Sequence, residues 1–156
     1  MYTRILVPME DEEYQEPALA HACTLAQQTG AAVILVWLVP VAASGEEYFF
    51  KQLQVEPGSS GERRMARGKE YLTQATKPFR AAGVDAVSQI EVTPLPPEQA
   101  IVELAVEKNV DLIIMATLPQ SAVGRFLFGS VGEKVRRRSP VPVLFVPPPQ
   151  SKEGVE

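Results

Sequence analysis

The chain has very few of the residues from which disulfide frameworks, metal centres and catalytic triads are built. Its 156 residues include one cysteine, Cys23, and one histidine, His21. A single cysteine excludes an intramolecular disulfide and fits a reducing compartment. A single histidine excludes a histidine-based metal cluster or a Ser-His-Asp triad within one chain. Both residues fall in an alanine-rich helical stretch, so we expect a small buried thiol and a partly exposed imidazole.

Long hydrophobic runs and a large excess of one charge are also lacking. The longest apolar run, 31–43, is too short to span a bilayer and contains Pro40, and the N-terminus has no charged-then-apolar leader pattern. The net charge is only −4, so the average surface should repel nucleic acid and anionic membranes. The one dense basic cluster, 136–138, ends a predicted helix and complements its dipole. We therefore expect a soluble cytoplasmic protein that binds neither nucleic acid nor membrane.

What the sequence does contain is an alternation of short apolar strands with helices. Five strands are predicted, the third less buried than the others, at 4–9, 32–39, 85–92, 111–115 and 141–146. Helices are predicted between them, at about 16–29, 62–82, 98–108 and 130–138. Strands separated by helices imply βαβ units. The expected fold class is α/β, a single-domain open five-stranded parallel sheet with helices on both faces.

Two segments have no clear pattern. Within the first, at about 41–61, residues 46–53 favour a short helix and 57–61 are typical of a flexible segment. The second, 148–156, is proline-rich and then polar, which is typical of a disordered tail. We therefore expect one domain over 1–147, with an insertion at about 41–61.

The most informative stretch follows the fourth predicted strand. Gly129 and Ser130 open the last predicted helix, so its first backbone N–H groups and one hydroxyl point toward the preceding loop. This geometry suits an anion such as a phosphate, and we call Gly129 and Ser130 the anion seat. The simpler alternative is an ordinary helix start with a serine near the cap position.

This stretch resembles the nucleotide loop of the universal stress protein family, which reads Gly, two residues, Gly, nine residues, Gly, then Ser or Thr. The same spacing here reads Ala116, two residues, Pro119, nine residues, Gly129, Ser130. The resemblance extends over nearly the whole chain, through the segments 5–8, 16–26, 33–40, 129–135 and 139–146. It implies sheet order 3-2-1-4-5 in a Rossmann-like fold of the adenine nucleotide alpha hydrolase type.

The resemblance also implies a ligand site between the first and fourth strands, where the winding of the sheet reverses. In nucleotide-binding members the adenine contacts the ends of the first two strands, and the phosphates contact the glycine loop. The implied cofactor is ATP or AMP, with Mg. The implied contacts in this chain are Pro8, Met9, Glu10, Leu38, Met115, Ala116, Pro119, Gly129, Ser130 and Val131.

Two departures from the family pattern argue against ordinary ATP binding. Ala116 places a methyl group where the pattern has bare backbone, and Pro119 removes an N–H donor and fixes φ near −65°. The acidic turn 10–13 would also repel a triphosphate, by about 1 kcal/mol for each contact at ~4 Å in water, unless a divalent cation offset it. The anion seat and Arg125 remain available to an anion.

Three functions are compatible with this pattern. The leading hypothesis is a stress-response or regulatory module with a degenerate nucleotide loop, which forms a homodimer through Val141, Val143 and Phe145 of the last strand and acts on unknown protein partners. For that pairing, Pro142 must face away from the open edge. The alternative is an ATP- or AMP-binding sensor or slow ATPase that uses the anion seat. An enzyme on a related nucleotide-binding fold is the third, with no convincing nucleophile–base pair to support it.

Overall fold

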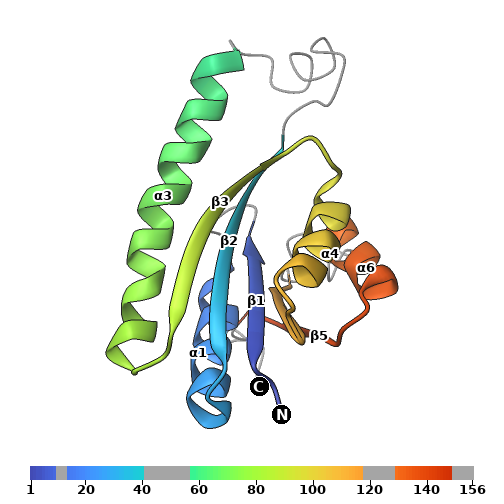
Figure 1. Ribbon diagram of the computed structural model, residues 1–156. Helices are drawn as coiled ribbons and strands as arrows, with labels where there is room; N and C mark the ends of the chain where they lie inside the picture. The colour runs from blue at the N-terminus through green and yellow to red at the C-terminus, as the bar shows by residue number, and fades with distance from the viewer. Residues whose placement is uncertain (10–13, 41–56, 118–128, 149–156) are drawn as a thin grey trace, which may run out of the picture.

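The computed structural model describes residues 1–9, 14–40, 57–117 and 129–148. Strands and helices alternate along this part of the chain: β1 (Arg4–Met9), α1 (Glu16–Thr29), β2 (Ala32–Pro40), α3 (Pro57–Ala81), β3 (Ala86–Thr93), α4 (Pro97–Glu107), β4 (Leu112–Ala116), α6 (Gly129–Arg138) and β5 (Val143–Val146). The strands form one parallel sheet in the order β3-β2-β1-β4-β5 (Figure 1). The predicted fold class and strand order are confirmed.

Helices cover both faces of the sheet, which explains why the strands are apolar along their whole length. Helices α1 and α3 lie on one face, and α4 and α6 lie on the other (Figure 1). Successive side chains of a strand point to opposite faces. In β1, Ile5 belongs to the core under α1 and α3, and Leu6 to the core under α4 and α6. A strand buried on both sides therefore has no polar position to alternate with.

The two edges of the sheet are less buried than its centre. All residues of β2 from Val33 to Val39 are buried, whereas most of β3 is exposed or half-buried. The expectation that the third strand is less buried than the others is confirmed. The reason is topological, because β3 pairs with β2 alone and has no strand on its other side.

Helix α1 has the ends that its sequence predicts. Pro17 lies in the first turn, where its missing N–H costs no helical hydrogen bond. Gly30 ends the helix with φ +77°, and its N–H donates to the carbonyl of Ala26 at 2.8 Å. His21 is exposed, as expected, but Cys23 is half-buried rather than buried. A groove between α1 and α3 opens beside the thiol, as described below.

Two element boundaries differ from the sequence-based expectation. Helix α3 begins at Pro57 rather than near residue 62, and it continues through Pro78 to Ala81. A proline is tolerated in the first turn of a helix, so Pro57 can begin one. Strand β5 begins at Val143 rather than Val141. The short helix expected at 46–53, most of the expected insertion and the tail from residue 149 lie outside the described residues.

Candidate functional site

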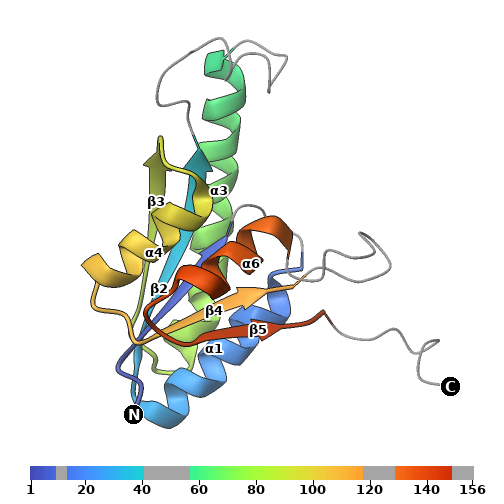
Figure 2. The same cartoon turned by 90° about the vertical axis from the view of Figure 1, so that its right-hand side faces the viewer.

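The pairing of β1 with β4 marks the place where the winding of the sheet reverses. These two strands pair only at Ile5–Leu112 and Leu6–Ile113. Beyond that point β1 continues to Met9 beside β2, while β4 continues beside β5. Figure 2 shows β4 and β5 turned away from the direction of β1, β2 and β3. Ligands of open α/β sheets bind beyond the carboxyl ends of the strands at such a switch point.

The described candidate residues are apolar and lie near the carboxyl ends of β1, β2 and β4 and at the start of α6. Met9, Leu38 and Met115 are buried, and Pro8 is buried beside Met9 in β1. Ala116 is half-buried at the end of β4, and Val131 is half-buried in the first turn of α6. These side chains divide between the two cores, with Met9 and Ala116 on the α1–α3 side. The structure thus brings the described candidates to the same end of the sheet, where they pack into the cores on its two faces.

The anion seat lies at the start of α6, as the sequence predicts. Gly129 and Ser130 are the first residues of this helix. Val135 anchors α6 in the core and is completely buried. Backbone N–H groups at a helix start have no partner within the helix, so an anion can accept from them. Three further candidates, Glu10, Pro119 and Arg125, lie outside the described residues.

Thr117 lies at the carboxyl end of β4 and was not predicted from the sequence as a site residue. It follows β4 directly and is buried. Its N–H donates to the carbonyl of Val146 at 3.0 Å, and its hydroxyl lies 3.4 Å from the same oxygen. These contacts hold the end of β4 against the end of β5. The sequence signal that could have found it is a hydroxyl residue that directly follows a buried strand and lies between Ala116 and Pro119 of the loop pattern.

Among the described residues, a carboxylate with a lowered pKa, that of Asp111, lies away from the switch point. Asp111 precedes β4 at the amino ends of the strands, opposite the switch point. Its carboxylate accepts hydrogen bonds from the N–H groups of Thr3 at 2.8 Å and Arg4 at 3.0 Å. Desolvation is the largest single influence on this carboxyl and raises its pKa, but the hydrogen bonds from Thr3 and Arg4 together outweigh it, so the pKa is lowered. This network ties the start of β1 to the start of β4.

The arginine run at the end of α6 pairs with carboxylates of the same chain. Arg136 donates to the half-buried Glu133, and this hydrogen bond lowers the pKa of that carboxyl. Arg138 lies 4.0 Å from Glu98, a buried carboxylate in the first turn of α4. The expected interaction with the helix dipole is therefore supplemented by ion pairs.

The described ranges contain neither a metal-binding cluster nor a membrane-spanning helix. His, Cys, Asp and Glu residues do not gather there into a group of three that could hold a metal ion. None of the helices in the described part of the chain has the length and hydrophobicity needed to cross a membrane.

Comparison with known proteins places this geometry in a family. The model of the universal stress protein family matches residues 1–147. A universal stress protein of Methanothermobacter thermautotrophicus is 30% identical over 94% of this chain and 96% of its own length. The solved structure of MJ0577, a universal stress protein of Methanocaldococcus jannaschii, is 27% identical and superposes with a TM-score of 0.76 over 97% of this chain and 99% of that one.

A second solved structure was determined with a nucleotide. It is described as a universal stress protein in complex with cAMP, is 26% identical and has a TM-score of 0.68 over 93% of this chain and 97% of that one. The order of the strands, the switch point between β1 and β4 and the start of α6 are consistent with the match of the family model over residues 1–147. The chain therefore belongs to the universal stress protein family.

Proposed function

We propose that this protein is a homodimeric, cytoplasmic stress-response module whose nucleotide site is weakened and which acts through protein partners. The observation that carries the proposal is the combination of a preserved switch point with a changed loop. The strand ends that hold Met9, Leu38 and Met115 meet at the switch point, and α6 begins at Gly129. The sequence, however, has Ala116 at the end of β4 and Pro119 three positions later, where bare backbone and an N–H donor would be needed.

The alternation of backbone groups along β5 supports a dimer through this strand. The carbonyl of Pro142 accepts from the N–H of Ile113 in β4, and the carbonyl of Val146 accepts from Thr117. Residues in even positions therefore face β4, and the backbone groups of Val143 point to the open edge. Val141, which the sequence also suggested for this edge, has both its N–H and its carbonyl hydrogen-bonded to the hydroxyl of Ser139 and does not contribute to it. Pro142 thus has its missing N–H on the β4 side, where it does not interrupt that edge.

The side chains of β5 support the same interface. Val143, Leu144 and Phe145 are only half-buried although they lie in a strand of the sheet. An apolar edge strand of this kind favours pairing with another strand. Antiparallel pairing of β5 with its copy across a twofold axis would cover the half-exposed side chains and use one self-complementary surface.

A second candidate function is a sensor of AMP-type nucleotides. The observation that favours it is the solved relative with bound cAMP, which shares the fold at 26% identity. A nucleotide with a single phosphate needs fewer loop donors than a triphosphate, and the anion seat with Arg125 could supply them. In this reading, Mg would accompany only ATP, because the divalent ion offsets repulsion between the triphosphate and the acidic turn 10–13.

Isothermal titration calorimetry tests the two functions against each other, after any nucleotide retained through purification has been measured. If the site is weakened, MgATP, AMP and cAMP should give no binding stronger than the millimolar range. Micromolar binding of AMP or cAMP without MgATP would support the monophosphate sensor. Micromolar binding of MgATP would contradict a weakened site, and the search for protein partners would lose its rationale.

A further inference from the structure

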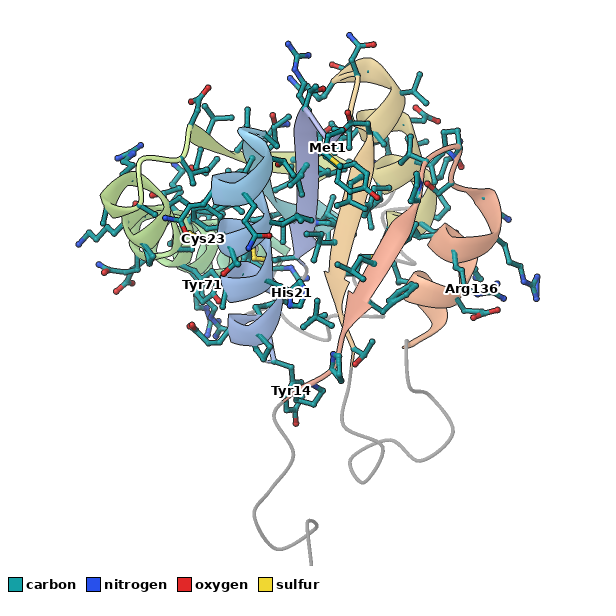
Figure 3. The ribbon with its side chains drawn as sticks, turned by 90° about the horizontal axis from the view of Figure 1, so that it is seen from below. Met1, Tyr14, His21, Cys23, Tyr71 and Arg136 are labelled. Atoms are coloured by element: carbon teal, nitrogen blue, oxygen red, sulfur yellow. The ribbon has the colours of Figure 1, made fainter. Side chains whose placement is uncertain are left out.

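A groove between α1 and α3 forms a second candidate binding site, on the opposite side of the sheet from the anion seat helix. It is lined only by residues of these two helices and encloses about 210 Å³. Figure 3 shows Cys23 of α1 and Tyr71 of α3 on this side of the molecule. An engineered apolar cavity of about 150 Å³ in another protein binds benzene. The groove is thus large enough for one aromatic ring with a short chain.

The floor of the groove is apolar and aromatic. Phe79 is almost completely buried below it, and Leu19 is buried beside it. The ring of Tyr71 forms part of the wall and lies 5.8 Å from the ring of Trp37, at an interplanar angle of 43°. A ring seated here would contact aromatic faces, which also attract cations.

One charged side chain, a carboxylate, is among the described residues that line the groove. Glu16 contributes an exposed carboxylate from the first turn of α1. Gln74 and Pro78 line the α3 side. In a regular helix the N–H of residue 78 would donate to the carbonyl of Gln74, but proline has no N–H, so this carbonyl lacks its regular helical donor. No lysine or arginine is among the residues that line the groove.

We propose that this groove binds a small organic cation, an amine that carries an aromatic or short aliphatic body. The body would rest on Phe79 and Tyr71. The ammonium would lie at the rim, where the Glu16 carboxylate attracts it and the Gln74 carbonyl can accept one of its N–H groups. The described lining residues include no cationic side chain that could bind an anion. A neutral hydrocarbon would form no hydrogen bond with the Glu16 carboxylate or the Gln74 carbonyl. Charge complementarity therefore selects the amine.

The chain carries its own two reporters for this site. Cys23 is the one cysteine of the sequence, and its half-buried thiol lies on the wall of the groove. Its reaction with a maleimide should slow when a ligand covers it. Trp37 is the one tryptophan, and its ring contacts Tyr71 of the wall. Its fluorescence should therefore change when a ligand moves or covers the Tyr71 ring.

The test compares 2-phenylethylammonium with 2-phenylethanol, which has nearly the same shape without the charge. The rate of Cys23 labelling and the fluorescence of Trp37 are measured as each probe is titrated. We expect the amine to protect Cys23 at concentrations roughly two- to fivefold lower than the alcohol, the effect of one exposed ion pair. Glu16→Gln should remove this advantage and leave the affinity for the alcohol unchanged.

Two further variants separate binding in the groove from indirect effects. Ala20→Leu fills the groove from an exposed position of α1 and should abolish protection by both probes. Glu107→Gln removes an exposed carboxylate of α4 and should change nothing. The proposal is overturned if neither probe protects Cys23, if both protect equally in the unmodified protein, or if Glu16→Gln leaves the advantage of the amine intact. Circular dichroism of each variant confirms that the fold is retained.

Discussion

Gly68 of α3 and Trp37 of β2 are in such close contact that no side chain fits between them. A Cβ atom on Gly68 would lie 2.4 Å from Cδ1 of the indole and 2.6 Å from its Nε1. Both residues are buried. Trp37 pairs in register with Met9 of β1, so this contact fixes α3 above the carboxyl ends of β1 and β2. A glycine in a helix interior costs about 1 kcal/mol relative to alanine, and here the close approach of the ring requires it.

Gly68→Ala should therefore lower stability although alanine is the better helix former. Overpacking of a filled core costs about 1–3 kcal/mol, which exceeds the gain in helix propensity. We expect the free energy of unfolding to fall by about 1–2 kcal/mol, measured by urea unfolding with circular dichroism. In a Trp37→Ala background Cγ, Cδ1 and Nε1 of the indole are all absent, so the same change should cost less. An equal cost in both backgrounds would show that the indole is not the cause.

Asp111→Asn should remove a pH-dependent part of the stability. The pKa of Asp111 in the folded protein is lowered from its ordinary value of 3.8, so the unfolded chain takes up the proton at higher pH than the folded one. The stabilisation by the ionised Asp111 carboxylate is fully present above the pKa that this group has in the unfolded chain. It is lost as the pH falls through the lower pKa of the folded protein. At neutral pH we expect a loss of about 1–2 kcal/mol from the contacts to Thr3 and Arg4.

The measurement for Asp111 is urea unfolding at pH 7 and at pH values below 3.8, where the difference between the two proteins should shrink. Asp85→Asn is the matched control, because Asp85 is exposed and precedes a strand in the same way. A difference for Asp111→Asn that stays constant across this pH range would contradict the role assigned to the carboxylate.

Phe145→Glu should convert the proposed dimer to a monomer. A carboxylate in β5 would face its copy across the twofold axis, and the like charges would repel in an apolar interface. Light scattering coupled to gel filtration measures the mass of each variant. Val87→Glu places the same charge on the other edge of the sheet, in β3, where Val87 is 55% exposed. This control should remain dimeric, and a monomeric wild type would refute the interface altogether.

Restoring the glycines should restore nucleotide binding if the loop alone weakens the site. The double variant Ala116→Gly/Pro119→Gly recovers bare backbone and one N–H donor, which we expect to tighten MgATP binding at least roughly tenfold, or about 1.4 kcal/mol. Calorimetry with MgATP gives the affinity. Adding Gly129→Val to this variant should abolish the gain, because the valine side chain blocks the approach to the anion seat. No gain from the double variant would place the obstacle in the acidic turn 10–13.

The order of elements was predictable because periodicity is a local property of the sequence. Continuous apolar runs such as 32–39 are typical of strands buried on both faces, and helices between such strands favour parallel pairing. The start of α3 was not predictable in the same way. Pro57 and the glycine and serine residues after it are typical of loops, yet the structure places them in a helix. Tertiary context overrides such weak local preferences.

The sequence by itself determined the α/β class, the apolar strands and the spacing that marks a degenerate nucleotide loop, since each depends on residues close together in the chain. Only the tertiary structure decided which distant residues meet. The β1–β4 pairing ends after Leu6, Thr117 holds Val146, and Gly68 lies against Trp37. The groove beside Cys23 likewise exists only where α1 and α3 pack together. Helix packing sets these contacts, and no period in the sequence encodes the approach of two helices.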